Sequence, residues 1–410
     1  MNGKMRGDAE EIVRRSIAAV MPNEAVRRAL ANRSLSGRLY LVAAGKAAWQ
    51  MAHTAVNCLG DLLTAGVVVT KYGHVKQEIP PCVCYEAGHP VPDENSFLGT
   101  QAALELVQRA REEDTVLFLL SGGGSALFEK PLISGEELQS ITGQLLACGA
   151  NIVEMNLVRK RLSAVKGGRF AQLCAPAKVY TVVLSDVIGD PLDMIASGPA
   201  CPDSSTCAQA LEVVEKYGLH LSDAAMDCLR RETPKQLDNV ETCITGSVRQ
   251  LCSAAANVCR ELGYQPIVLT DRLCCEAREA GSFLASILKS HEGTQQPLAF
   301  IAGGETVVHL TGKGKGGRNQ ELALAAAPGI AGMANAAVFS VGSDGTDGPT
   351  DAAGGYADGD TQLELAAQGY AVHKVLSDNN AYPALQAVNG LLFTGPTGTN
   401  VNDVAVALLS

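Results

Sequence analysis

One stretch of the sequence gathers residue types that suit the binding of a phosphate. From Glu305 to Asp351 the chain runs through a glycine-rich basic segment, the start of a helix, a strand and an acidic glycine loop. Glycines lack Cβ atoms, so the backbone can approach an anion closely, and lysine and arginine side chains add positive charge. The residues of this kind are Gly312, Lys313, Gly314, Lys315, Gly316, Gly317 and Arg318. The helix that begins near Gly317 would direct its amide dipole to the same place. The segment predicts a phosphate-binding loop, with a merely flexible turn as the alternative.

Carboxylates follow this loop. The apolar run Ala336–Val341, which we interpret as a strand, leads into a loop with Asp344, Asp347 and Asp351. Hard carboxylate oxygens beside a phosphate suit Mg²⁺ better than a soft metal. Asp344 and Asp347 are therefore candidate metal ligands. The working hypothesis is a phosphate donor, a divalent cation and a phosphoryl acceptor.

A second glycine loop follows another predicted strand. Thr115–Leu120 is an apolar run typical of a buried parallel strand. The residues that follow it are Ser121, Gly122, Gly123, Gly124 and Ser125. Open α/β sheets bind ligands at such strand ends, where these residues would form an amide nest for a carboxylate or a phosphate. A tight strand-to-helix turn is the alternative.

Three further polar residues are candidates for chemistry. Lys46 follows the apolar strand Leu39–Ala43 and is placed to reach a phosphate or substrate oxygen, although a lone lysine is more often simply solvated. Asp186, in a loop after a strand, suits a metal ligand or a base, or else caps a turn. His89 is the only histidine placed for catalysis, and we interpret it as structural.

The glycine pattern also has a formal match to a dinucleotide-binding fingerprint. Gly312, Gly314 and Gly317 fit the spacing G-x-G-x-x-G, but no acidic residue about twenty positions further on is placed to hold a ribose. The sequence contains no GxxxxGK[ST] P-loop either. The pattern therefore argues against nicotinamide binding and leaves a phosphate grip as the favoured interpretation.

Composition narrows the class of protein. A chain of 410 residues with 47% hydrophobic and 19% charged residues is long enough for two or three packed domains. Its net charge of −10 makes nonspecific binding to nucleic acid or to an anionic membrane unfavourable. An aromatic content of 4% argues against an aromatic-lined nucleic-acid or carbohydrate surface. Any anion must be bound by local structure.

Cysteine usage and the N-terminus indicate a cytoplasmic location. The 13 cysteines are scattered, without a CxxC motif, as expected of small buried residues in a reducing compartment. The N-terminal sequence has no apolar run typical of a signal peptide, and no apolar stretch is long enough to span a bilayer. We expect neither a zinc site nor a membrane partner.

Alternating strand and helix patterns predict an α/β fold with mostly parallel sheets. The polar segment Arg231–Glu241 is the best candidate for a boundary between domains. We therefore expect an N-terminal domain over residues 1–235 and a C-terminal α/β domain over residues 236–410.

Together the motifs resemble a known family over nearly the whole chain. They are AAGKAAWQMA, LSGGGSAL, NxVRKxLSxxKGGRxA, SDVIGDPLxxIASGP, GGETVV, GKGxGGRNQELALA and SDGTDGPTDAAGG, in that order. This combination resembles the glycerate 2-kinase family, with a glycerate-kinase domain followed by a MOFRL region over about residues 298–405. The resemblance implies a Rossmann-like N-terminal domain and an active site in the cleft between domains. It also implies phosphorylation of D-glycerate to 2-phosphoglycerate with ATP and Mg²⁺.

The resemblance also implies functional residues. The family's active-site lysine and arginine correspond to Lys46 and Arg318, and its acids to Glu305, Asp186 and Asp344. The asparagine of TGPTGTN is Asn400, and Asn319 follows the arginine in the glycine-rich motif. Arg318 and Lys46 would neutralise the transferred phosphoryl group, and Asp186 would orient or deprotonate the glycerate hydroxyl. Ser121–Ser125 would hold either the glycerate carboxylate or nucleotide phosphates.

Two other functions stay open from the residues. One is reduction of hydroxypyruvate with NADH or NADPH, which needs a nicotinamide site and a proton donor. The other is a non-enzymatic α/β protein that binds a small molecule, which does not explain why lysine, arginine and acids gather in glycine-rich loops. We expect a small-molecule substrate, no nucleic acid, and a homodimer as the assembly to test.

Overall fold

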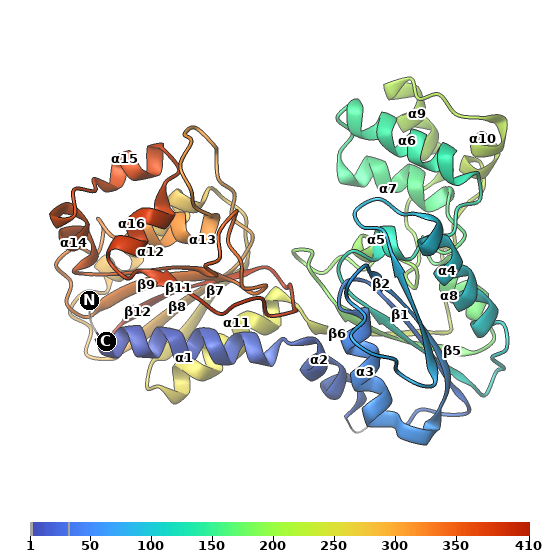
Figure 1. Cartoon of the computed structure of the whole chain (residues 1–410), viewed down its shortest axis with the longest axis horizontal. Coiled ribbons are helices and arrows are strands. Elements are labelled where there is room, and N and C mark those ends of the chain that lie inside the picture. Colours follow the sequence, from blue (N-terminus) through green and yellow to red (C-terminus); the bar gives the residue numbers. More distant parts are fainter. Residues whose placement is uncertain (1–2, 32) are drawn as a thin grey trace. The chain divides into compact units, whose positions relative to one another are not determined.

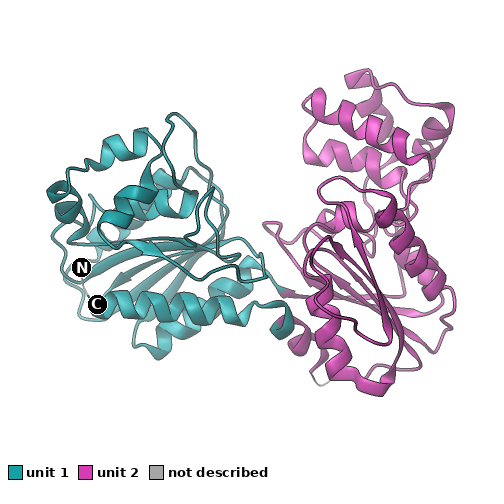
Figure 2. Ribbon diagram, in the orientation of Figure 1, with its two compact units in different colours: residues 1–24, 246–410 teal, residues 25–245 magenta. Residues whose placement is uncertain are grey.

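The computed structural model describes residues 3–31 and 33–410, which form two compact units (Figure 2). We call residues 25–245 the N-terminal unit, and residues 1–24 with 246–410 the C-terminal unit. The grouping differs from the expected ranges 1–235 and 236–410 chiefly at the start of the chain. Helix α1 (Gly3–Ala19) packs against α11 (Val248–Glu261), and the hydroxyl of Tyr264 donates to Asp8 at 2.8 Å. Helix α1 belongs to the C-terminal unit because its apolar face packs against α11 of that unit.

The N-terminal unit is built on a six-stranded sheet (Figure 1). Its strands are β1 (Leu39–Ala44), β2 (Leu63–Lys71), β3 (Cys82–Ala87), β4 (Thr115–Leu120), β5 (Lys178–Leu184) and β6 (Val240–Gly246). They lie in the order β3-β2-β1-β4-β5-β6, and the neighbours from β3 to β5 pair in parallel. β1 and β4 are buried along their whole length, which is why they are continuous apolar runs. The expected Rossmann-like parallel sheet is confirmed.

The strand order of this sheet reverses at one point, and open α/β sheets bind ligands at such a point. The chain moves outward from β1 to β3 and then returns to place β4 on the other side of β1. The order therefore reverses between β1 and β4, and the carboxyl ends of these two strands form the switch point of the sheet. Open α/β sheets bind ligands at such a switch point, outside the carboxyl ends of the strands. Lys46 follows β1 and Ser121 follows β4, so both lie at this point.

Helices connect these strands. They are α2 (Pro22–Leu30), α3 (Ala48–Leu59), η1 (Gly60–Leu62), α4 (Glu94–Val107), α5 (Gly124–Leu127), α6 (Gly135–Ala147), α7 (Ile152–Arg161), α8 (Arg169–Cys174), η2 (Ile195–Ser197), α9 (Cys207–Tyr217) and α10 (Asp223–Leu229). Helices α6, α7, α9 and α10 share a small apolar core of their own. Polar side chains cap their N-termini; Asn151, for example, accepts from the amides of Val153 and Glu154.

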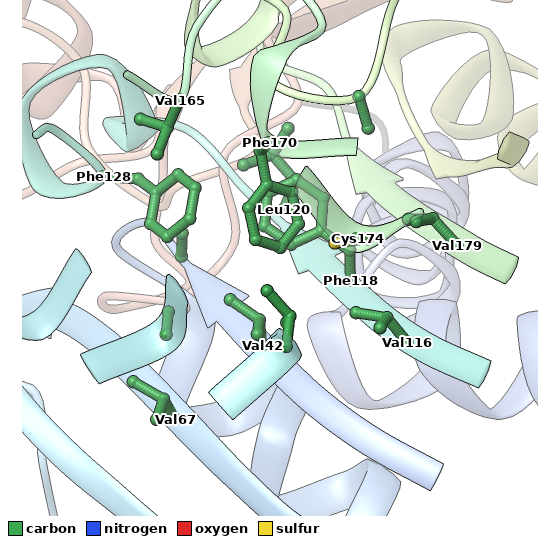
Figure 3. Close-up of a cluster of buried hydrophobic side chains, with 14 of the residues drawn as sticks. Val42, Val67, Val116, Phe118, Leu120, Phe128, Val165, Phe170, Cys174 and Val179 are labelled. Atoms are coloured by element: carbon green, nitrogen blue, oxygen red, sulfur yellow. The ribbon is translucent and has the colours of Figure 1, made fainter. Parts of the chain in front are cut away.

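A cluster of three phenylalanines fills the main core of this unit (Figure 3). The ring centroids of Phe118, Phe128 and Phe170 lie 4.6 to 5.5 Å apart, and all three side chains are fully buried. Phe118 comes from β4 and Phe170 from α8, while Phe128 follows α5 directly. Aromatic rings at these separations stabilise one another beyond their burial. The packing anchors the short helix α5, and with it the glycine loop that precedes it.

The C-terminal unit contains a mixed sheet (Figure 1). Its strands are β7 (Gln265–Leu273), β8 (Leu298–Gly304), β9 (Ala336–Gly342), β10 (Gly354–Asp358), β11 (Leu391–Leu392) and β12 (Asp403–Leu409), in the order β11-β10-β9-β12-β8-β7. The pair β7–β8 is parallel, and the last strand, β12, is inserted antiparallel between β8 and β9. The start of β12 therefore lies beside the ends of β8 and β9, because antiparallel neighbours reverse direction.

Helices and loops complete this unit. Besides α1 and α11, its helices are α12 (Ala277–Ser290), α13 (Arg318–Ala326), α14 (Thr361–Ala367), α15 (Val372–Ser377) and α16 (Ala381–Ala387). Helix α13 is buried from Asn319 to Ala326 and packs against α12, β9 and β10. In the part of the chain covered by residues 3–31 and 33–410, no helix has both the length and the apolar character that a membrane crossing requires.

One buried ion pair lies beside the phenylalanine cluster. Nζ of Lys166 lies 2.7 Å from Oε2 of Glu129, and both side chains are fully buried. The same ammonium donates to the carbonyl oxygen of Phe128 at 3.1 Å. Burial lowers the pKa of Lys166, and the charge of Glu129 opposes that effect. Each charge depends on its partner because neither contacts water.

We predict that Lys166→Met destabilises the protein by about 3–5 kcal/mol, because it leaves the Glu129 carboxylate buried without its cation. The double variant Lys166→Met/Glu129→Leu removes both charges and should recover most of this loss. The free energy of unfolding is measured by urea titration. The control is Lys216→Met, which breaks the more exposed pair with Glu154 (2.6 Å) and should cost less than about 1 kcal/mol. Equal losses in the two single variants would contradict the prediction.

Candidate active site

Two glycine turns meet at the switch point of the N-terminal unit. The amide of Lys46 donates to the carbonyl oxygen of Gly122 at 2.9 Å, and the amide of Ala47 donates to Oγ of Ser121 at 3.1 Å. A Cβ atom on Gly45 would collide with Ser121, so the two turns can approach this closely only with glycine there. The turn after β1 is thereby bonded to the loop after β4, while the side chain of Lys46 remains exposed.

The carboxylate of Asp186 lies on the same glycine loop. It follows β5, the next strand in the sheet, and a Cβ atom on Gly122 would collide with its Oδ2. A Cβ atom on the next residue, Gly123, would lie 3.1 Å from Cγ of Lys46. Lys46, Asp186 and Ser121–Ser125 were predicted from separate motifs. The structure brings them together because β1, β4 and β5 are adjacent parallel strands.

A polar network that the sequence did not reveal supports this loop from behind. Oγ of Ser197 donates to Oδ1 of Asn156 at 2.9 Å, which uses its only hydrogen. In the second hydrogen bond, 3.1 Å long, Ser125 Oγ is therefore the donor and Ser197 Oγ the acceptor. Ser197 has a left-handed backbone, with φ of 62°, and so has Ala196, with φ of 50°. Such conformations are costly without glycine and persist where the surroundings enforce them. The SGPA segment was a possible signal, since its glycine and proline suggest an unusual turn.

The C-terminal unit holds a second cluster, centred on Arg318. Nε and Nη2 of Arg318 donate to the two carboxylate oxygens of Asp403 at 2.6 and 3.0 Å, and Nη1 donates to Glu305 at 2.8 Å. Arg318 begins α13, Glu305 follows β8 and Asp403 begins β12. Burial acts to lower the pKa of Arg318, but the hydrogen bonds to Asp403 outweigh it and raise the pKa. The guanidinium is therefore a permanent, oriented cation.

Asp403 is the residue of this cluster that sequence analysis missed. Asn400, which was predicted instead, lies nearby on the surface, where its Oδ1 accepts from the amide of Asn402 at 3.3 Å. Asn402 in turn donates to Oε2 of Glu305 at 3.3 Å. The sequence shows three polar residues around the start of the last strand, Asn400, Asn402 and Asp403. Only the antiparallel pairing of β12 with β8 and β9 decides which of them faces Arg318.

Asp344 and Asp347 have different surroundings although they lie in one loop. Oδ1 of Asp344 accepts from the amide and the hydroxyl of Thr346 at 3.0 and 3.2 Å, and the side chain is partly exposed. A Cβ atom on Gly342 would lie 3.2 Å from Oδ1 of Asp344 and 3.4 Å from Oδ1 of Asp403. Asp344 therefore lies at the edge of the Arg318 cluster.

Asp347 is buried and caps a helix. Its Oδ1 accepts from the amide of Asn319 at 3.1 Å and its Oδ2 from the amide of Gln320 at 2.9 Å, so the carboxylate meets the N-terminus of α13. Burial raises the pKa of Asp347 to about 6, against the effect of these hydrogen bonds. The structure thus gives this carboxylate helix-capping partners where the sequence predicted a metal. The side chain of Asn319 is also buried, and it bonds Asp347 and Ser340.

The glycine-rich loop, residues 311–317, has protein partners for its amides. Asn379 Oδ1 accepts from the amides of Thr311 and Gly312, at 2.8 and 2.9 Å. The next three amides donate to Asp378 and Asn380 at 2.8 to 3.1 Å; they belong to Lys313, Gly314 and Lys315. Contrary to the expectation from sequence, these five amides are engaged and offer no donor to a phosphate. Gly312 and Gly314 are required for a different reason, because Cβ atoms there would collide with residues 378–380.

The described residues suit a magnesium ion that keeps most of its water. Among residues 3–31 and 33–410 there is no group of three or more histidine, cysteine, aspartate or glutamate side chains arranged to hold a metal. Mg²⁺ in phosphoryl-transfer sites is commonly held by only one or two carboxylates plus substrate phosphates and water. The partly exposed carboxylate of Asp344 fits that requirement.

The sequence is similar to known protein families and proteins over nearly its whole length. Residues 8–230 match the family model of a domain of unknown function, DUF4147, and residues 298–403 match the MOFRL family. The D-glycerate 2-kinase of Thermotoga maritima is 54% identical, over 98% of this chain and 97% of that protein. The glycerate 2-kinase of Pyrococcus horikoshii is 42% identical, over 92% of this chain and 88% of that protein.

A solved structure has the same fold. The crystal structure of glycerate kinase from Thermotoga maritima superimposes with a TM-score of 0.95 at 52% identity, covering 99% of this chain and 100% of that one. Both halves of this chain match, and the match extends over nearly its whole length. The chain belongs to the glycerate 2-kinase family.

Proposed function

We propose that this protein transfers the γ-phosphoryl group of ATP to the 2-hydroxyl of D-glycerate and so forms 2-phosphoglycerate and ADP. The observation that carries the proposal is the group at the switch point, where Lys46 and Asp186 flank one glycine loop. A cation beside a carboxylate on an open glycine loop suits a small hydroxy acid. The names of the relatives, D-glycerate 2-kinase and glycerate 2-kinase, support this substrate.

Phosphoryl transfer requires alignment and charge neutralisation more than covalent help. In the N-terminal unit, we assign Asp186 to orient the glycerate hydroxyl and to accept its proton, and Lys46 to neutralise negative charge on the substrates. In this reaction the hydroxyl oxygen bonds to the γ-phosphorus, the bond to the ADP oxygen breaks, and the hydroxyl proton passes to Asp186. Ser121–Ser125 holds the substrate against this pair.

In the C-terminal unit, we assign Arg318 to the transferred phosphoryl group. Asp403 engages two of its nitrogens and is 8% exposed at the side chain, whereas Glu305 engages only Nη1 and is 46% exposed. A phosphoryl oxygen can therefore replace Glu305 at Nη1 while Asp403 keeps the guanidinium oriented. Glu305 and Asn400 then contact the substrate or the nucleotide from the edge of this cluster.

Asp344 is the proposed magnesium ligand. When bound, the metal neutralises charge on the phosphate oxygens of ATP. Asp347 was predicted as a second ligand, and we now propose that it acts through α13 instead, because its carboxylate receives two amides of that helix. Cytoplasmic location and a homodimer stay predictions from the sequence.

A coupled assay tests the proposed reaction directly. Purified protein receives D-glycerate, ATP and Mg²⁺, and enolase added without a mutase reports 2-phosphoglycerate. Lys46→Ala and Arg318→Ala should each lower kcat/KM by about 10²–10³-fold, because each removes a charge that stabilises the transition state. Arg318→Lys should recover little, since lysine lacks the guanidinium fork that engages Asp403. The control is Lys313→Ala, an exposed lysine in the glycine-rich loop, which should retain activity.

A parallel arm contains hydroxypyruvate with NADH or NADPH. Oxidation of the cofactor without release of ADP would overturn the kinase proposal in favour of a reductase. Absence of turnover in both arms would favour another hydroxy acid or a binding protein.

Substitution of the two acids of the SDGTDG loop, Asp344 and Asp347, should have different effects on the Mg²⁺ concentration that activity requires. Asp344→Asn should raise the Mg²⁺ concentration needed for half-maximal activity by about 10–100-fold, the scale on which changes around a metal ligand act. Asp347→Asn should leave that concentration within about threefold, because its carboxylate is bonded to the helix. A larger effect of Asp347→Asn on the Mg²⁺ requirement would contradict this assignment.

Ionisation of Asp347 should also affect how the free energy of unfolding depends on pH. Its folded pKa is about 6, above the ordinary value of 3.8, so the folded state holds this proton more tightly than the unfolded state. Its contribution to stability is therefore greatest below about pH 4, falls between about pH 4 and 6, and is constant above. The free energy of unfolding of the wild type should fall over this interval relative to that of Asp347→Asn. Parallel curves for the two proteins would show that the carboxylate is not destabilised by burial.

A further inference from the structure

His89 lies at the glycine loop of the N-terminal unit, although we interpreted it as structural from the sequence. It follows β3 in the chain and its ring packs on the loop after β4. A Cβ atom on Gly123 would lie 3.0 Å from Cδ2 and 3.1 Å from Nε2 of His89, and 3.1 Å from Cγ of Lys46. The imidazole and the lysine therefore flank the same glycine.

The ring nitrogens of His89 are available to a ligand. The residue is partly buried, and no residue in the described part of the chain forms a hydrogen bond with either nitrogen. Other histidines differ in this respect: Nδ1 of His74, for example, lies 2.8 Å from the carbonyl oxygen of Lys46. Each ring nitrogen can therefore bond a ligand, as a donor or an acceptor according to the tautomer.

The surroundings of His89 favour its neutral form. Burial lowers its pKa, and the positive charges of Lys46, Lys71 and His74 lower it further. The carboxylate of Asp186 lies against Gly122, the residue before Gly123. A neutral imidazole has one N–H donor, which it can offer to an anion whose charge Lys46 balances.

Neighbouring glycines of this loop therefore face groups of opposite hydrogen-bonding character. Its first glycine meets a carboxylate, Asp186, and its second meets two donors, Lys46 and His89. Adjacent Cα atoms are about 3.8 Å apart. A 2-hydroxy acid carries its hydroxyl and its carboxylate on neighbouring carbon atoms, so the two groups can face neighbouring residues of the loop. The hydroxyl suits the acceptor, Asp186, and the carboxylate suits the donors, because the opposite placement would bring two carboxylates together.

We propose that His89 is a substrate-binding residue that, with Lys46, holds the carboxylate of glycerate by donating a hydrogen bond to it. The inference rests on the proposed function and adds the orientation of the substrate. With the carboxylate at Gly123, the 2-hydroxyl is the one that meets Asp186, and the 3-hydroxyl, one carbon further away, is not. His89 thus helps to determine which hydroxyl is phosphorylated.

Binding and kinetics test this role on the full-length protein. In calorimetric titration with D-glycerate, His89→Ala should weaken Kd by about 10–100-fold, the range for one hydrogen bond to a charged group. KM for D-glycerate should rise similarly, with KM for ATP and kcat changed less than about threefold. His89→Gln, which keeps an N–H donor, should recover part of the affinity. The matched control is His220→Ala, an exposed histidine in the same unit, and it should behave as the wild type.

A second measurement addresses the carboxylate itself. The wild type should prefer D-glycerate to glycerol, which lacks the carboxylate, and His89→Ala should reduce this preference by about tenfold or more. The product of His89→Ala should also contain an increased share of 3-phosphoglycerate. A wild-type Kd in His89→Ala, or a loss of kcat with KM unchanged, would overturn the proposal. Absence of glycerate binding and turnover in the wild type would instead overturn the proposed function.

Discussion

The close approach of two strand ends is the constraint on which the N-terminal unit depends. The turns after β1 and β4 touch through their backbones, and Gly45 is the residue that makes this contact sterically feasible. A side chain there would separate the turns and displace both Lys46 and the glycine loop. The buried phenylalanines behind α5 and the Ser197–Asn156 hydrogen bond hold the loop from the other side. The loop is therefore fixed by packing, while Gly122 and Gly123 remain partly exposed.

The C-terminal unit reaches a comparable rigidity through side chains. Asp347 caps α13, Asn379 and its neighbours bind the amides of the glycine-rich loop, and Asp403 orients Arg318. These contacts join segments that are far apart in the sequence. Their common effect is that the guanidinium of Arg318 has one orientation. Preorganised charge of this kind stabilises a transition state without the cost of rearrangement during the reaction.

The sequence predicted the fold well because its signals are local. Continuous apolar runs predicted buried parallel strands, and glycine turns predicted where these strands end. The placement of helix α1 did not follow from these signals. Its apolar face can pack on either unit as far as periodicity shows, and its actual partner, α11, lies more than two hundred residues further along the chain.

For the site, sequence alone determined the residue types: a lysine and an acid after parallel strands, an arginine at a helix start, and glycines where backbone must approach something closely. The segments that pack against these glycines follow from the tertiary structure. The glycines of residues 311–317 accommodate residues 378–380, and the buried acid of the SDGTDG loop caps α13. The spacing of glycines and acids in the sequence indicates where the backbone is crowded or a carboxylate is required. The residues that contact the glycine or the carboxylate belong to a distant segment of the chain. For the same reason the sequence predicted neither the role of Asp403 nor the orientation of His89. Both depend on strand pairing and loop packing, which are long-range interactions that a local pattern does not contain.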